Sequence, residues 1–305
     1  MAAISKDNKK GINLFLIGIK GYESLKFLVK NKFYKNINFV IVGRDKNISN
    51  DFSKEIAELC SVSGLEYGFR DQKGLKIPFA EISIAISWKW IIELNNTLLV
   101  LHDSILPKYR GHLPLVSQLI DGQEEIGVTA ILGNEKYDEG DIVYISKSKI
   151  KYPIKIKDAI KIINECYCET LKFLFDCIES SIQFDTTPQD HSKASYSLWR
   201  DEDDYFIDWN WSIQKIIRFV DSVGYPYKGA KTIFKDREIT VEKIKALQNV
   251  NITNRDNGKI FKLYNGKPII VCKDGLLLLE IAKDRQTNKS IFPITSLRQR
   301  FKNKT

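Results

Sequence analysis

Few residues of this chain could carry proton chemistry, and one of them stands in a crowded stretch. Only three histidines occur in 305 residues, and His102 lies in the segment LHDSILPKYRG, residues 101–111, directly after an apolar run. Asp138 lies further along, in the segment NEKYDEGDIV. A carboxylate can fix the tautomer of an imidazole and raise its basicity. The first hypothesis is therefore a His102–Asp138 proton-transfer pair.

Each member of this pair also has an ordinary structural interpretation. A single histidine at the end of a buried strand is more often a hydrogen-bonded core residue, and an aspartate close to Gly140 is more often a turn residue. Two features favour chemistry. Residues 108–110, Lys-Tyr-Arg, could meet a pyrophosphate, and Gly140 would let the backbone come close to a ligand.

A sheet must position these residues, and the sequence predicts one. Apolar runs alternate with amphipathic patterns from residue 12 onward, which is typical of an α/β fold with a Rossmann-like, mostly parallel sheet and helices on both faces. In such a sheet the chemistry gathers at the carboxyl ends of the strands. The expected strands are 12–19, 37–43, 81–87, 97–102, 126–133 and 141–150, and the expected helices are 21–32, 49–64, 112–122 and 156–182.

The length and pattern indicate two domains. Residues 1–183 are the predicted catalytic domain, 184–224 a polar connector with a helix near 211–223, and 225–305 a smaller β-rich, OB-like lobe. Asp-Arg, Asn-Gly and Asp-Gly turns separate short strands in this lobe, and ITSLRQRF, residues 294–301, is the expected last helix.

The composition narrows the classes of function. Five cysteines without a Cys-x-x-Cys pair indicate neither a disulfide framework nor a zinc site, and no metal is expected. No apolar stretch reaches the length of a membrane span, and the N-terminus lacks a secretory pattern, so a cytoplasmic location is expected. The net charge of +9 comes mostly from scattered lysines, which favours a solvated surface over a nucleic-acid interface.

The stretch from His102 to Val143 resembles the signature of the N10-formyltetrahydrofolate-dependent formyltransferases. That family includes methionyl-tRNA formyltransferase, glycinamide ribonucleotide formyltransferase and the sugar-nucleotide N-formyltransferases. The matching pieces are His-x-Ser-x-Leu-Pro-x-Tyr-Arg-Gly at 102–111, Gly-Val-Thr at 127–129 and Asp-x-Gly-Asp at 138–141. Residues 196–234 resemble the segment that leads into the family's C-terminal lobe. Several motifs in one order are more specific than a lone motif.

The resemblance implies a reaction and a set of site residues. A substrate amine attacks the formyl carbon of N10-formyltetrahydrofolate, a charged tetrahedral intermediate forms, and the folate nitrogen leaves. His102 would lie beside the oxyanion and the moving proton, with Asp138 orienting and charging it. The residues expected at the folate are Ser87, Trp88, Trp90, Ile91, Asn134, Tyr137 and Asp138, and those expected at the acceptor substrate are Ser104, Lys108, Tyr109, Arg110, Trp199, Arg200 and Tyr225.

One residue departs from the family pattern. The family has an asparagine two residues before the histidine, where its amide helps to hold the formyl oxygen, and this chain has Val100. A valine side chain cannot donate that hydrogen bond. Lys89, in the segment SWKW at the end of the preceding strand, is the candidate replacement, because an ammonium can stabilise an oxyanion. Its alternative is a surface lysine.

Three hypotheses for the acceptor follow. The first is N-formylation of a dideoxy amino sugar linked to UDP or dTDP, in bacterial surface-glycan biosynthesis. The second is methionyl-tRNA formylation, which the basic charge would suit but which the lack of a long basic insertion between Val42 and Ile82 disfavours. The third is a catalytically dead binding module, suggested by Val100 alone. A homodimer is possible, and no membrane partner is expected.

Overall fold

The computed structural model describes residues 11–46, 50–93 and 96–304, which form two compact units. The first unit comprises the residues up to Pro114 together with 125–149 and 160–197, and the second comprises 115–124, 150–159 and the chain from Leu198 onward. The domain boundaries expected at residues 183 and 224 stay predictions.

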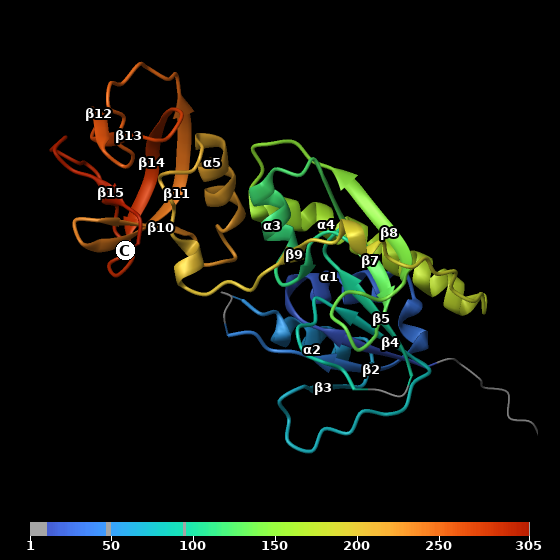
Figure 1. Ribbon diagram of the computed structural model, residues 1–305. Coiled ribbons are helices and arrows are strands. Elements are labelled where there is room, and N and C mark those ends of the chain that lie inside the picture. The colour runs from blue at the N-terminus through green and yellow to red at the C-terminus, as the bar shows by residue number, and fades with distance from the viewer. Residues whose placement is uncertain (1–10, 47–49, 94–95, 305) are drawn as a thin grey trace, which may run out of the picture. The chain divides into compact units, whose positions relative to one another are not determined.

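The first unit contains the predicted Rossmann-like sheet (Figure 1). Its strands lie in the order β3-β2-β1-β4-β5-β7-β8; neighbours from β3 to β5 run parallel, and β7 and β8 pair antiparallel. The mostly parallel α/β fold is therefore confirmed. Its strands are β1 (Ile12–Leu16), β2 (Ile37–Val42), β3 (Tyr67–Phe69), β4 (Ile82–Ile86), β5 (Thr97–His102), β7 (Glu125–Leu132) and β8 (Ile142–Lys149).

The α-helices occur close to where the hydrophobic periodicity predicted them. They are α1 (Gly18–Lys30), α2 (Ser53–Val62), α3 (Pro114–Asp121), α4 (Ile156–Glu179) and α5 (Ile213–Ser222). Helix α2 is shorter than predicted: Ser49 lies outside the described residues, and the helix begins at Ser53, whose backbone N–H donates to Asp51 at 3.0 Å. Gly64, with φ +68°, follows its end in the left-handed conformation that favours glycine.

The two faces of the sheet are covered differently at its centre. Helix α1 lies on the face of Leu16, because a Cβ on Gly21 would be 3.1 Å from the Leu16 side chain. The opposite face carries a cluster that includes Phe15, Ala85 and Val100, which occupy one register row of β1, β4 and β5. Loop residues complete this cluster, namely Leu75, Trp88 and Ile92. Near the strand ends, loop residues therefore cover part of this second face.

The second unit contains a six-stranded antiparallel sheet within the described residues, which confirms the β-rich lobe. The strand order is β12-β13-β14-β11-β10-β15. Asn265 and Gly266 form a tight turn of positive φ between β12 and β13, as predicted. The turn between β10 and β11 is formed by Lys235 and Asp236, one residue earlier than the predicted Asp-Arg turn, and both residues have positive φ. The strands are β10 (Ala230–Phe234), β11 (Arg237–Leu247), β12 (Ile260–Tyr264), β13 (Lys267–Val271), β14 (Leu276–Asp284) and β15 (Phe301–Lys302).

The last helix predicted from the sequence is wrong. Residues 294–301 form no helix, and Phe301 belongs to β15, opposite Phe234 of β10. The two rings stack with centroids 4.4 Å apart, and Phe301 is almost fully buried. Burial of an aromatic side chain against the sheet therefore outweighs a weak helical pattern.

Several smaller features bear on function. Within the described residues, no helix is long and apolar enough to cross a membrane, and no three or more His, Cys, Asp or Glu side chains are grouped to hold a metal ion. The cysteines are free thiols, and burial raises the pKa of Cys60 and of Cys272 to about 12. A short parallel pair, β6 (Arg110–Gly111) with β9 (Tyr196–Ser197), attaches the connector to the loop after β5.

Candidate active site

The structure brings together the two residues of the predicted proton-transfer pair. His102 ends β5 and is buried, and its Nδ1 lies 3.4 Å from Oδ1 of Asp138. Its Nε2 lies 2.8 Å from the backbone oxygen of Tyr109. A carbonyl oxygen only accepts, so Nε2 carries the hydrogen in this contact. The ring is thereby held on both nitrogens, with a carboxylate beside Nδ1.

The loop that carries Asp138 is backbone-strained and tightly fitted. Asp138 has φ +56°, in the left-handed region where a residue other than glycine costs about 1–3 kcal/mol. Its Oδ2 accepts a hydrogen bond from the backbone N–H of Gly111 at 2.7 Å. At Gly140 an added Cβ would lie 1.6 Å from the carbonyl oxygen of Leu132, so only glycine fits there. Ser87 and Tyr109 also have positive φ, and strain of this kind is typical of functional sites.

The turn between His102 and the Lys-Tyr-Arg run is fixed by side-chain hydroxyls. Ser104 Oγ donates to the backbone oxygen of Lys108 at 2.7 Å, and its predicted contact with the acceptor substrate stays a prediction. Thr129 Oγ1, on β7, accepts from the backbone N–H of Leu106 at 3.1 Å and donates to the Ser104 carbonyl at 2.6 Å. The backbone path after His102 is therefore set from both ends of the turn.

The Lys-Tyr-Arg run is divided between solvent and interior. Lys108 is exposed, whereas Arg110 is only 1% exposed. The guanidinium of Arg110 donates to Gln189 Oε1 from Nε at 3.2 Å and from Nη2 at 2.7 Å, and its Nη1 lies 3.4 Å from Glu139. The Arg110 side chain is therefore buried, whereas a side chain that contacts a diphosphate would face the solvent. That contact stays a prediction, for which Lys108 is the accessible cation of the run.

Aromatic rings line the strand ends where the folate was predicted. The Trp88 ring meets Trp90 edge to face at 4.9 Å and Phe15 at 5.2 Å between centroids. Both indoles crowd the backbone at Gly43, where an added Cβ would lie 2.8 Å from Trp90 and 3.0 Å from Trp88. The indole N–H of Trp88 is buried without a hydrogen-bond partner among the described residues. The contact of these rings with folate stays a prediction.

The remaining predicted folate residues lie at the surface. Ile91 and Tyr137 are exposed by 71% and 66%, and Asn134 uses its Oδ1 to accept from the backbone N–H of Lys136 at 2.9 Å. Exposed apolar side chains are available to a ligand. Their contact with folate stays a prediction.

Val100 and Lys89 occupy different surroundings. Val100 packs in the apolar cluster with Phe15 and Trp88. The Lys89 ammonium lies 2.8 Å from Oδ2 of Asp45 and 5.2 Å from the Trp90 ring centroid. The role of Lys89 as the oxyanion donor stays a prediction. For that role, the ammonium would have to leave its contact with Asp45.

We expect a Lys89→Ala variant to lose formyl-transfer rate if the ammonium stabilises the oxyanion, since removal of one such donor costs about 10²–10³ in kcat. The measurement is kcat and KM with saturating cofactor. Lys26→Ala, at an exposed α1 lysine whose partner is Glu23, is the matched control. An unchanged kcat in Lys89→Ala would show that Lys89 is a surface lysine without a role in catalysis.

A second ionisable cluster lies directly behind His102, and no sequence pattern indicates its partners. Asp103 is buried and contacts the ammonium of Lys20 on α1 and the hydroxyl of Tyr167 on α4. Burial lowers the pKa of Lys20 to about 7. His102 shares the face of Val100, since side chains alternate along a strand, and Asp103 turns to the helices. His102 and Asp103 therefore point to opposite faces of the sheet.

The other predicted substrate residues belong to the second unit. Trp199 and Tyr225 expose 62% and 68% of their surface. Arg200 Nη1 donates to the backbone oxygen of Asp204 at 3.3 Å. Exposed aromatic rings can stack on a base, and this role stays a prediction for both.

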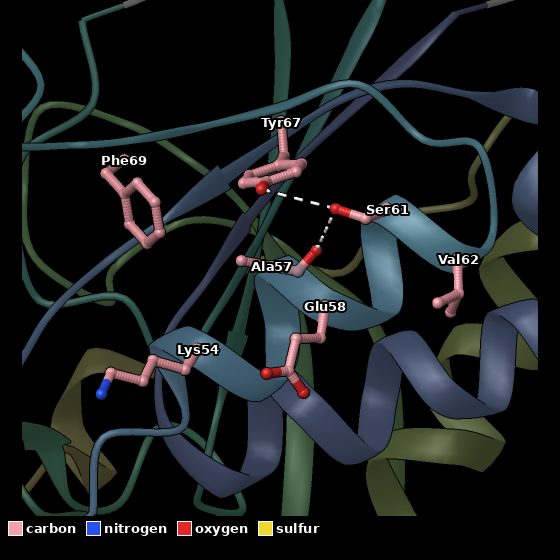
Figure 2. Close-up of a pocket in the computed structure, with 7 residues that line it drawn as sticks. All are labelled: Lys54, Ala57, Glu58, Ser61, Val62, Tyr67 and Phe69. Carbon is pink, nitrogen blue, oxygen red and sulfur yellow. Dashed lines mark hydrogen bonds between the residues drawn. The ribbon is translucent and has the colours of Figure 1, made fainter.

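A separate shallow pocket of about 340 Å³ lies between α2 and β3 (Figure 2). Ser61 donates to the Ala57 carbonyl at 3.0 Å, and its hydroxyl lies 3.5 Å from that of Tyr67. The pocket is lined by Lys54, Ala57, Glu58, Ser61, Val62, Tyr67 and Phe69. It contains none of the predicted site residues, and we assign it no part in catalysis.

Comparison with known proteins bears directly on this site. A methionyl-tRNA formyltransferase from Thermodesulfovibrio yellowstonii is 28% identical over 255 residues, which cover 77% of each chain. An N-formyltransferase from Helicobacter canadensis, solved with folinic acid and dTDP-3-aminofucose, is 16% identical with a TM-score of 0.64 over 89% of this chain and 98% of that one. HypX from Aquifex aeolicus is 14% identical with a TM-score of 0.58; the match covers 91% of this chain but only 46% of HypX.

Two family models match successive parts of the sequence. The formyl transferase model matches residues 80–164, which include β5, His102 and Asp138. The model of the formyl transferase C-terminal domain matches residues 200–299, which include most of the antiparallel sheet. With the histidine and the aspartate in contact at the strand end, these matches show that the chain belongs to the formyl transferase family of enzymes.

Proposed function

We propose that this protein moves the formyl group of N10-formyltetrahydrofolate to the amine of an amino-sugar nucleotide, with UDP or dTDP as the nucleotide, in bacterial surface-glycan biosynthesis. The observation that carries the chemical part is the contact of His102 Nδ1 with Asp138 Oδ1 at 3.4 Å, at the carboxyl end of a central strand. The choice of acceptor rests on separate support, given below.

The chain's own residues suit the chemistry of this transfer. N10-formyltetrahydrofolate, when bound, supplies an activated formyl group. His102 can hold or move a proton, and the Asp138 carboxylate can compensate positive charge on the ring. The backbone oxygen of Tyr109 fixes the plane of the imidazole. His102 is buried and Asp138 is half-buried, which limits the access of water to the pair and strengthens its electrostatic effect on a nearby oxyanion.

The folate site that we propose follows the ends of β1, β2 and β4. Trp88 and Trp90 offer ring surfaces, and Ile91 and Tyr137 add exposed apolar area. No metal ion is needed for this reaction, because the histidine, the carboxylate and the backbone supply the proton and the charge compensation.

Similarity in structure supports the sugar nucleotide as the acceptor, and similarity in sequence supports methionyl-tRNA, the alternative. The Helicobacter canadensis enzyme, whose structure holds dTDP-3-aminofucose, has nearly its whole length covered. The Thermodesulfovibrio yellowstonii relative acts, by its name, on methionyl-tRNA. Between β2 and β4 this chain has one helix and one short strand among the described residues, and no long basic insertion in its sequence. This favours the small nucleotide substrate.

The test compares two acceptors under one set of conditions. We expect formyl transfer from N10-formyltetrahydrofolate to a 3-amino or 4-amino dideoxy sugar linked to dTDP or UDP. Mass spectrometry of the sugar nucleotide detects the product. We expect no transfer to methionyl initiator tRNA. Transfer to the tRNA and not to any sugar nucleotide would make the protein a methionyl-tRNA formyltransferase. Folate binding without transfer to either would support a binding module.

A further inference from the structure

The connector holds the loop that carries Asp138 through a single buried side chain. The amide nitrogen of Gln189 donates to the backbone oxygen of Asp138 at 2.8 Å and to that of Gly140 at 2.7 Å. Gln189 is 6% exposed and lies 51 residues after Asp138 in the chain. Both hydrogens of one amide therefore bind the two carbonyls that flank Glu139, and they fix the loop from outside.

The acceptor end of the same amide is fixed by Arg110. Nε and Nη2 of Arg110 donate to Gln189 Oε1 at 3.2 and 2.7 Å, and Nη1 lies 3.4 Å from Glu139. A buried guanidinium is tolerated only when it is paired and hydrogen-bonded. The Gln189 amide thus cannot rotate without losing bonds at both ends.

The backbone on either side of Arg110 meets the catalytic pair itself. The Tyr109 carbonyl oxygen contacts His102 Nε2 at 2.8 Å, and the Gly111 N–H donates to Asp138 Oδ2 at 2.7 Å. The contacts close into a ring that runs from His102 through residues 109–111 and Gln189 to Asp138 and back. Asp138 is held in its left-handed conformation by its side chain and by its own carbonyl.

We propose that Gln189 is a positioning residue for formyl transfer, which holds Asp138 at the separation from His102 that proton transfer requires. The proposal rests on the function proposed above. Gln189 acts through the Asp138 carbonyl. Without it, the strained backbone at Asp138 loses a restraint and the carboxylate moves relative to the imidazole. A displacement of about 1 Å in a catalytic arrangement can cost about 10²-fold in rate.

Two substitutions at Gln189 test the proposal. Gln189→Leu removes both donors and the acceptor at similar volume; Gln189→Glu keeps an acceptor for Arg110 but sets an oxygen against the carbonyls of the loop. We expect each to lower kcat by about 10- to 100-fold, with KM for cofactor and acceptor within about threefold. Asp190→Asn is the matched control, because that exposed neighbour bonds to Ser192 and Lys193.

A double variant separates positioning from a general loss of packing. In the Asp138→Asn protein, Gln189→Glu is expected to cost little further activity, because residues that act through one another are not additive. Fully additive losses would overturn the proposal.

A second readout needs no activity. Nitrogen-15 spectra of the three histidines report the ring nitrogens of His102 directly. We expect the His102 resonances of Gln189→Leu or Gln189→Glu to move toward those of Asp138→Asn, and unchanged resonances in a folded variant would overturn the proposal. If the wild-type protein transfers no formyl group, the proposed function fails, while this spectrum still decides whether Gln189 positions the pair.

Discussion

His102→Asn is expected to lower kcat for formyl transfer by about 10²- to 10⁴-fold, with KM nearly unchanged. Asparagine keeps a polar side chain at the end of β5 but cannot take up and return a proton near neutral pH. The buried imidazole faces Asp138 on one nitrogen and the Tyr109 carbonyl on the other. Its loss removes a contribution made in the transition state. Steady-state kinetics with the accepted sugar nucleotide measure the effect.

The matched control uses another histidine of the same chain. His112 is exposed and lies just beyond β6, and His112→Asn is expected to keep wild-type kcat. Asp138→Asn should reproduce most of the His102→Asn loss, and the two losses together should fall short of additivity, because the residues act as one unit. A His102→Asn protein that is folded and turns over at the wild-type rate would contradict the assignment.

The strand-end rule accounts for His102, because chemistry gathers at the carboxyl ends of parallel strands. It does not place Asp138: β7 runs antiparallel to β5, so the loop after Leu132 starts beside Leu99, at the other end of β5, and folds back to reach His102. Gln189 obeys no strand-end rule either. It lies in an irregular, polar connector, and its bonds to residues 138 and 140 depend on how the chain folds back.

Other differences from prediction also have specific physical causes. Strand β3 has three residues, too few for an alternating pattern to be recognised, and Phe301 sits in a strand because its ring stacks on Phe234. Arg110 looked like a surface cation beside Lys108, and its burial depends on a partner 79 residues away. Periodicity reports which face of an element is apolar, but it does not report a polar contact between distant segments.

The buried cluster behind His102 predicts a pH dependence of stability. Burial lowers the Lys20 pKa from 10.5 to about 7 in the folded protein. Between these values the unfolded chain binds a proton at Lys20 that the folded protein does not. Stability must therefore rise with pH in this window, and the contribution is lost as pH falls through about 7. The limiting slope for one group is about 1.4 kcal/mol per pH unit.

Lys20→Met should remove this slope while keeping the length of the side chain. Urea denaturation measures the free energy of unfolding of both proteins. Between about pH 7.5 and about pH 9.5, this free energy is expected to rise by about 2–3 kcal/mol more in the wild type than in the variant. The Asp103 carboxylate favours the ammonium and so makes this slope an upper bound. Lys26→Met, on the exposed side of α1, should run parallel to the wild type. Parallel curves for Lys20→Met as well would mean that Lys20 stays charged across this range, held by Asp103 against the cost of burial.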